Sequence, residues 1–199
     1  MELEQGSQDW LKWRTRGIGS SDAAVLAGTS PWRNIQQLWT EKVTGVSEIK
    51  ENWAMARGKE LEAVARDLFE FEYGCLVPPK NLVHPEYAFI KASLDGLCEA
   101  ENYLVEFKAP GKADLELARS GVIPDKYYAQ VQWQLLVSGC KFGMYVCYDG
   151  KTSLYCVQVF PDKRYQRNLI RLAKWFWHKV ENKIEITKKY KIKLRMPTV

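Results

Sequence analysis

The sequence predicts an α/β or α+β domain in which a central mixed β-sheet is flanked by helices. Three observations predict this fold class. Long segments repeat apolar residues at the helical period, short β-branched and aromatic segments are bounded by turn residues, and one helical segment interrupts the run of strands. A length of 199 residues suits one domain, and we expect residues 1–199 to form a single one.

Helices are expected where apolar spacing coincides with capping residues at the ends of a segment. These segments are 7–15, 17–28, 35–44, 54–73, 125–138 and about 162–181. In the second of them, Ser20 or Ser21 is the expected N-cap and Gly28 the expected end. The helix 54–73 is the clearest, with an inward stripe of Leu61, Val64, Ala65, Leu68 and Phe69.

Strands are expected at 75–77, 82–84, 93–98 and 103–108. A hairpin should follow the helix 125–138, because two strand-like segments, 144–149 and 153–160, meet at Asp149-Gly150. An Asp-Gly pair between such segments is a strong signal of a tight hairpin turn.

The composition argues against a membrane protein. The chain is 46% hydrophobic and 27% charged, and it contains no run of the ~18–20 apolar residues that a membrane helix requires. The first ten residues are polar and acidic, unlike a signal or transit peptide. We therefore expect a cytoplasmic protein that does not contact a membrane.

The cysteines argue against a zinc site and against a disulfide framework. Their number is odd, their spacing is wide, and no C-x-x-C pair occurs; they are Cys75, Cys98, Cys140, Cys147 and Cys156. We expect all five to be packing residues.

The net charge of +5 and pI of about 8.9 permit a polyanionic partner without requiring one. Basic residues are densest near the end of the sequence: Lys183, Lys188, Lys189, Lys191, Lys193 and Arg195. A solvated basic segment and a DNA contact are equally consistent with this cluster.

The most informative residues are Asp95, Glu106 and Lys108. If a turn is centred on Ala100-Glu101, Asp95 faces Glu106 across an antiparallel hairpin, with side chains on one face. Alternation places Lys108 on that face too. Two adjacent carboxylates repel unless a cation lies between them, and Mg²⁺ suits one or two carboxylates. This pattern favours metal-assisted hydrolysis of a phosphodiester.

A simpler interpretation is a cross-strand ion pair on a solvated face, with Asp95 only opening a turn. Two further residues bear on the choice. Glu62 lies at the edge of the apolar stripe of helix 54–73, where it either points at the hairpin or is solvated. Gln130 and Gln132 belong to three glutamines spaced by two, so at least one should point inward and be hydrogen-bonded.

Four motifs together resemble a known family. G-K-x-x-E at 58–62, S-x-D-G-L at 93–97, E-x-K at 106–108 and Y-x-A-Q-V-Q at 127–132 are similar to the PD-(D/E)xK nucleases. More narrowly, they resemble the phage lambda exonuclease and YqaJ-type viral recombinase family, over about Trp10 to Asp149. The resemblance implies the PD-(D/E)xK restriction-endonuclease-like fold. Leu94 departs from the commoner S-P-D-G form of the second motif.

The resemblance also implies roles for these residues. Asp95, Glu106 and the backbone carbonyl of Phe107 would bind Mg²⁺, with Mn²⁺ as a second option. Lys108 would be the catalytic lysine, Gln130 would lie beside the attacking water, and Glu62 would lie near a second metal position.

Arg14 and Ser21 match an arginine and a serine that hold a 5′-terminal phosphate in the family. The chemistry agrees, because a helix N-terminus attracts anions and arginine clamps phosphate. From the residues alone, the simpler interpretation of Ser20 or Ser21 is an N-cap. Arg16 could take the place of Arg14, and Arg33 is a weaker candidate.

The family resemblance implies a 5′→3′ exodeoxyribonuclease. It would digest one strand of linear double-stranded DNA and leave a 3′ single strand for phage-type recombination in a bacterial or phage-infected host cell. A ring-shaped homotrimer and a single-strand annealing protein are the implied partners. The alternatives are an endonuclease of restriction or repair type and a catalytically dead DNA-binding module.

Overall fold

The computed structural model describes residues 3–46, 53–187 and 193–196. The basic residues Lys188, Lys189 and Lys191 lie outside this range. The elements, in chain order, are α1 (Gln8–Thr15), α2 (Ser20–Leu26), α3 (Ile35–Thr44), α4 (Trp53–Tyr73), β1 (Lys80–Val83), β2 (Lys91–Leu94), β3 (Gly96–Cys98), β4 (Tyr103–Lys108), α5 (Lys112–Arg119), α6 (Asp125–Ser138), β5 (Phe142–Tyr148), β6 (Leu154–Val159) and α7 (Lys163–Glu181).

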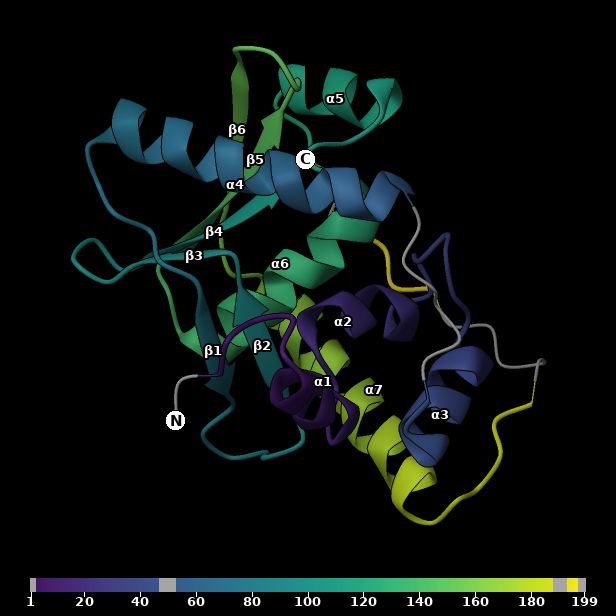
Figure 1. Ribbon diagram of the computed structural model, residues 1–199. Coiled ribbons are helices and arrows are strands. Elements are labelled where there is room, and N and C mark those ends of the chain that lie inside the picture. Colours follow the sequence, from purple (N-terminus) through teal and green to yellow (C-terminus); the bar gives the residue numbers. More distant parts are fainter. Residues whose placement is uncertain (1–2, 47–52, 188–192, 197–199) are drawn as a thin grey trace.

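The strands form two sheets (Figure 1). The larger has the order β3-β4-β5-β6, and the smaller pairs β1 with β2. Strands β4 and β5 are parallel because α6 lies between them in the sequence, whereas the other pairs are antiparallel. The predicted mixed sheet flanked by helices is confirmed.

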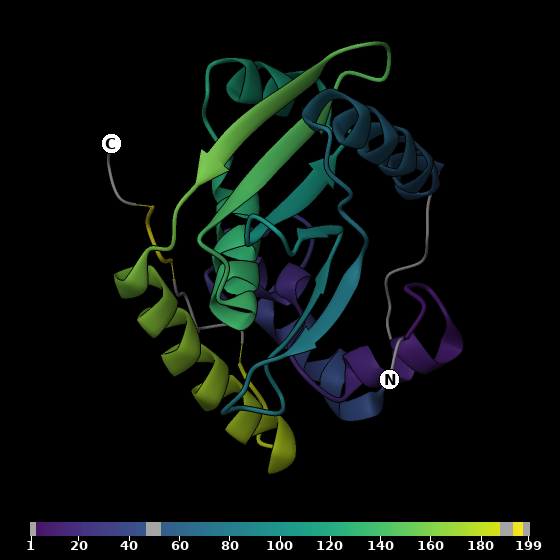
Figure 2. The ribbon, with the colours of Figure 1, turned by 90° about the vertical axis from the view of Figure 1, so that its left-hand side faces the viewer.

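The helices cover the larger sheet from both sides (Figure 2). Helix α4 lies on one face and α6 on the other, with α7 packed outside α6. Strand β4 alternates between these layers: Val105 and Phe107 pack with Phe69 of α4, whereas Leu104 joins the cluster that contains α6 and α7. Strand β4, which carries Glu106 and Lys108, therefore has a strand on either side and a helix on each face.

The expected helices are present, with two corrections. The N-cap of α2 is Gly19, and Ser20 and Ser21 are its first two helical residues. Gly19 has no side chain to cap the helix, but its N–H donates to the Asp22 carboxylate at 2.9 Å. On α4, Val64 is 43% exposed, because the sheet contacts only the narrower stripe that includes Ala65 and Phe69.

Two local predictions were wrong, and one helix, α5, was missed. Residues 75–77 form no strand, since Pro78 and Pro79 follow and lack N–H donors for a ladder. The predicted strand 93–98 is two strands, separated at Asp95, where the chain leaves the small sheet and enters the large one. Helix α5 is only eight residues long, and Ala118 is its one buried residue, so it has no long apolar stripe.

Other expectations can be compared directly with the structure. All five cysteines are free, as predicted. Among the helices that the structure describes, none is long and apolar enough to cross a membrane.

Candidate functional site

Glu106 is a carboxylate in the middle of the large sheet. Its side chain is fully buried and points toward α6. The side-chain amide of Gln130 donates to Oε1, and that of Gln134, one helical turn later, donates to Oε2. An unpartnered buried carboxylate would be strongly unfavourable, so these amides make the burial possible.

Asp95 lies at the junction between β2 and β3, beside Glu106. The predicted hairpin register is confirmed, since Gly96 pairs with Val105 and Cys98 with Tyr103. The Phe107 N–H donates to Asp95 Oδ2 at 3.1 Å, and the Arg66 guanidinium of α4 donates to the Asp95 carbonyl at 2.8 Å. Both the side chain and the backbone of Asp95 are thus fixed.

Lys108 brings the carboxylates together. Its Nζ lies 2.6 Å from Glu106 Oε1, 3.4 Å from Glu62 Oε1 and 3.9 Å from Asp95 Oδ2. It also donates to the Phe107 carbonyl at 2.8 Å. Burial opposes the ammonium, but the three carboxylates prevail and raise the pKa of Lys108 well above its usual value. Burial, then the charge of Glu106, raises the pKa of Asp95.

The donor set fits a hard divalent cation. Oxygens of Asp95, Glu106 and the Phe107 carbonyl all surround one position, now taken by the Lys108 ammonium. Among the described residues, no three His, Cys, Asp or Glu side chains form a metal-binding group. Two carboxylates and a carbonyl leave the remaining positions to water and substrate, which is the usual arrangement for Mg²⁺.

The glutamines of α6 divide into two roles. Gln130 donates to Glu106, and its implied place beside an attacking water stays a prediction. Gln132 points away and binds the backbone of Phe160 and Asp162, so it is structural. Gln134 was not predicted as a site residue, although its position four residues after Gln130 places both amides on one helix face.

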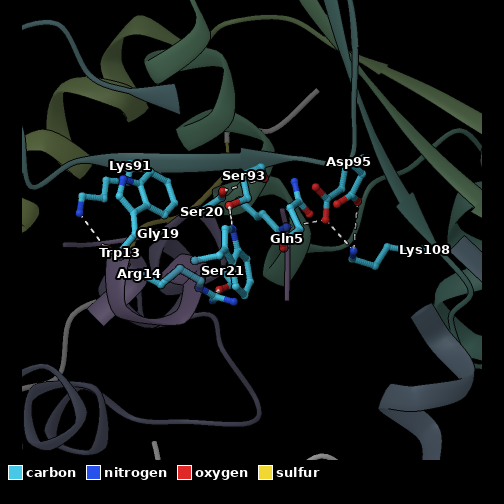
Figure 3. A pocket seen from close by; sticks show the side chains of 13 residues that line it. Gln5, Trp13, Arg14, Gly19, Ser20, Ser21, Lys91, Ser93, Asp95 and Lys108 are labelled. Carbon is cyan, nitrogen blue, oxygen red and sulfur yellow. Dashed lines mark hydrogen bonds and ion pairs between the residues drawn. The ribbon is translucent and has the colours of Figure 1, made fainter. Parts of the chain in front are cut away.

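Arg14 and Ser21 meet at the N-terminus of α2. The Arg14 guanidinium donates to Ser21 Oγ at 2.8 Å and lies 4.6 Å above the Trp10 ring. Both residues line a cavity of about 140 Å³ that also reaches Asp95, Glu106 and Lys108. Figure 3 shows Arg14 and Ser21 at one end of this cavity and Asp95 and Lys108 at the other. One cavity therefore joins the two predicted sites.

Asp22 does not line this cavity, but its hydrogen bonds fix the Arg14 end of it. Its fully buried carboxylate accepts hydrogen bonds from the Gly19 N–H and from Lys42 Nζ, both at 2.9 Å. Lys42 also donates to the Arg14 carbonyl at 3.2 Å. Burial alone would raise the pKa of Asp22, but Lys42 and then Arg33 hold it well below its usual range. This network was not predicted from the sequence.

The alternatives to Arg14 are placed elsewhere. The Arg33 guanidinium pairs with Asp22 and Glu41 and is not among the residues that line the cavity. Arg16 is exposed and does not line the cavity either. Of the three arginines considered, Arg14 is the one whose guanidinium reaches Ser21.

Lys91 is a further cation on the cavity wall. It is 7% exposed, and its Nζ donates to the Trp13 carbonyl at 2.7 Å. Burial, with repulsion from Lys42 and Arg16, lowers the pKa of Lys91 to about 8. Lys91 was not predicted from the sequence, because its partner is a backbone carbonyl 78 positions away.

Comparison with known sequences identifies relatives. The family model of the YqaJ-like viral recombinase domain matches residues 9–141. The uncharacterized protein YqaJ of Bacillus subtilis (strain 168) is 34% identical over 143 residues, which cover 70% of this chain and 44% of that protein. The uncharacterized protein R354 of Acanthamoeba polyphaga mimivirus is 27% identical over 153 residues, covering 69% and 28%. The chain thus spans less than half the length of either relative.

Solved structures share the fold. An alkaline exonuclease (LHK-Exo) from Laribacter hongkongensis has 26% identity and a TM-score of 0.77, covering 89% of this chain and 94% of that one. Its complex with dAMP gives 27% and 0.78 over the same shares. A phage related exonuclease from Haemophilus somnus 129PT, at 12% identity and a TM-score of 0.63, is a likeness of fold alone.

Replacing Lys42 by methionine should destabilise the protein, because it deprives the buried Asp22 carboxylate of one of its cations. Breaking a buried ion pair from one side typically costs about 3–5 kcal/mol. As a matched control, Lys12→Met breaks only the exposed pair with Asp9 and should cost less than about 1 kcal/mol. Urea unfolding of both variants measures the difference. Equal losses would show that the Asp22 network does not stabilise this region.

Lys91 should make stability depend on pH. Its pKa is lowered from 10.5 to about 8 in the folded state, so between these values the unfolded chain binds more protons. The free energy of unfolding of the wild type, relative to Lys91→Met, should therefore rise from about pH 8 to 10.5 and be constant below pH 8. Urea unfolding of both proteins at several pH values tests this. A difference independent of pH would contradict it.

Proposed function

The chain belongs to the YqaJ-like viral recombinase domain family, and from this premise we propose that it is a Mg²⁺-dependent 5′→3′ exodeoxyribonuclease. It would digest one strand of linear double-stranded DNA and leave a 3′ single strand for homologous recombination. One observation carries the proposal: a single cavity joins the carboxylates around Lys108 to the Arg14–Ser21 pair. The name of the solved structure with 26% identity, an alkaline exonuclease, agrees with a nuclease.

The acidic end of the cavity supplies the chemistry. Asp95, Glu106 and the Phe107 carbonyl would hold Mg²⁺ or Mn²⁺, which supplies Lewis acidity toward the scissile phosphate. Gln130 and Gln134 fix the Glu106 carboxylate in one orientation through both of its oxygens. The Lys108 ammonium lies among these groups and can donate hydrogen bonds to anionic phosphate oxygens.

The basic end of the cavity supplies position. Arg14 offers a guanidinium, and Ser21 offers a hydroxyl in the first turn of α2, where the helix dipole favours an anion. A terminal phosphate bound there would be held at a fixed distance from Asp95, because Asp22 ties Gly19 directly and Arg14 through Lys42. Each terminal nucleotide would then present the same bond for hydrolysis.

The family resemblance also supports two proposals about assembly. Three copies would form a ring that encloses DNA, and a single-strand annealing protein would receive the 3′ strand. Light scattering of the purified chain tests the first, and co-purification with an annealing protein tests the second.

Asp95→Asn and Glu106→Gln should each remove most Mg²⁺-dependent hydrolysis of a linear duplex, because each deletes a charged metal ligand. Lys108→Ala should lower the rate by ~10²–10⁴-fold, the usual value of a positioned proton donor. Glu116→Gln, an exposed carboxylate on α5, is the control and should be near wild type. Rates on end-labelled duplexes, with and without EDTA, measure these effects.

A closed circular duplex extends the same assay to the rival functions. The proposed exonuclease leaves the circle intact, and an endonuclease cuts it. A DNA-binding module with a dead site turns over neither substrate at any Mg²⁺ concentration. Undiminished rates in Asp95→Asn or Glu106→Gln would remove the assigned metal site.

Arg14→Ala should abolish most of a preference for 5′-phosphorylated over 5′-hydroxyl duplex ends. Ser21→Ala should lose a smaller share, because the backbone N–H groups of α2 remain. Lys12→Ala, an exposed cation on the same helix as Arg14, is the control for net charge and should keep the preference. Digestion rates on the two kinds of end give the ratio. A wild type that treats both ends alike would disprove the phosphate pocket and leave the metal site untouched.

A further inference from the structure

The loop 29–34 between α2 and α3 is held firmly by backbone contacts. The Ser30 N–H donates to the Ala24 carbonyl at 3.1 Å. The Ser30 hydroxyl accepts from the N–H groups of Trp32 and Arg33, both at 3.3 Å. The Arg33 side chain is fixed in the buried Asp22 network described above. The loop backbone is therefore set in one conformation.

The Trp32 indole projects from this fixed loop and is 62% exposed. Scattered exposed apolar residues are ordinary on protein surfaces, so exposure alone assigns no role. What distinguishes Trp32 is that a rigid support presents it beside the candidate site.

The neighbours of Trp32 connect it to Lys108 of the candidate site. Its ring centroid lies 6.0 Å from that of Tyr127, at the start of α6. The Lys108 Nζ lies 6.0 Å from the same Tyr127 ring. One aromatic ring thus separates Trp32 from Lys108.

A cation accompanies the two rings. Lys126 Nζ lies 5.4 Å from the Trp32 ring and 5.3 Å from the Tyr127 ring, and it is fixed by a 2.6 Å ion pair with Asp114. Aromatic faces combined with basic side chains are how proteins bind single-stranded nucleic acid, with bases on the rings and phosphates near the cations. Paired bases inside a duplex are already stacked, so this combination selects an unpaired base.

We propose that Trp32, with Lys126 beside it, is a stacking platform for an unpaired nucleobase of single-stranded DNA at the edge of the candidate nuclease centre. The proposal rests on the proposed function only in assuming that DNA is the substrate. It adds a contact to a base, whereas the residues described above contact phosphate and metal. Stacking tolerates any base, so the platform should act regardless of sequence.

Binding without hydrolysis tests this proposal. The probe is a fluorescent oligo-dT strand in EDTA, and a blunt duplex of equal length is the reference. Trp32→Leu keeps an apolar side chain but removes the aromatic face, and it should weaken oligo-dT binding about 5- to 150-fold, the range for stacking of one base. Trp32→Tyr should restore most of the affinity. Phe71→Ala, an exposed aromatic on α4, should bind as the wild type does.

The results separate this proposal from the proposed function. A loss confined to oligo-dT in Trp32→Leu, with rescue in Trp32→Tyr, supports the platform even if no hydrolysis occurs. Equal losses on oligo-dT and blunt duplex would overturn it, as would unchanged affinity in Trp32→Leu or a wild type that does not bind oligo-dT. Thermal melting of each variant establishes that it is folded. If the enzyme is active but one of these overturning results is found, the proposed function stands and the platform is rejected.

Discussion

The fold is organised around one carboxylate, that of Glu106, whose side chain is fully buried. Glu106 lies in a central strand, and burying such a charge is highly unfavourable unless opposite charge and hydrogen-bond donors surround it. The requirement selects the neighbours: two glutamines on one face of α6, and Lys108 two residues along the same strand. The need to compensate the buried charge of Glu106 therefore accounts both for the packing of α6 on the sheet and for the residues that surround the site.

The other end of the cavity follows the same principle with different residues. Asp22 is also buried, and its partners come from α3 and from the loop that precedes it. Because one of these partners, Lys42, also donates to the Arg14 carbonyl, the ion-pair network that keeps Asp22 charged also sets the position of Arg14. Two buried carboxylates thus fix the two ends of one cavity. Glu106 lines the cavity itself, whereas Asp22 lies outside it and acts on Arg14 through Lys42.

Much of the site could be predicted from the sequence, because strand alternation and hairpin register are local rules. They predicted the register in which Gly96 pairs with Val105 and Cys98 with Tyr103, and they put Lys108 on the face of Glu106, whose carboxylate lies 2.6 Å from Lys108 Nζ. Gln134 and Lys42 were missed because their roles depend on the packing of helices against distant strands. The break at Asp95 was missed for a related reason: local sequence predicts a strand but not which of two sheets it joins.

The division of one extended segment between two sheets restricts how the chain can change in length. Asp95 is the residue between two ladders, β2 with β1 and β3 with β4. Directly after it, any side chain at Gly96 would collide with Val77. Residues inserted in the connection 85–88 or the turn 99–102 lengthen only a loop. An insertion within 91–98 displaces one ladder by a residue and turns its side chains to the opposite face. Homologues of different length should therefore differ in those two connections and keep this eight-residue interval unchanged.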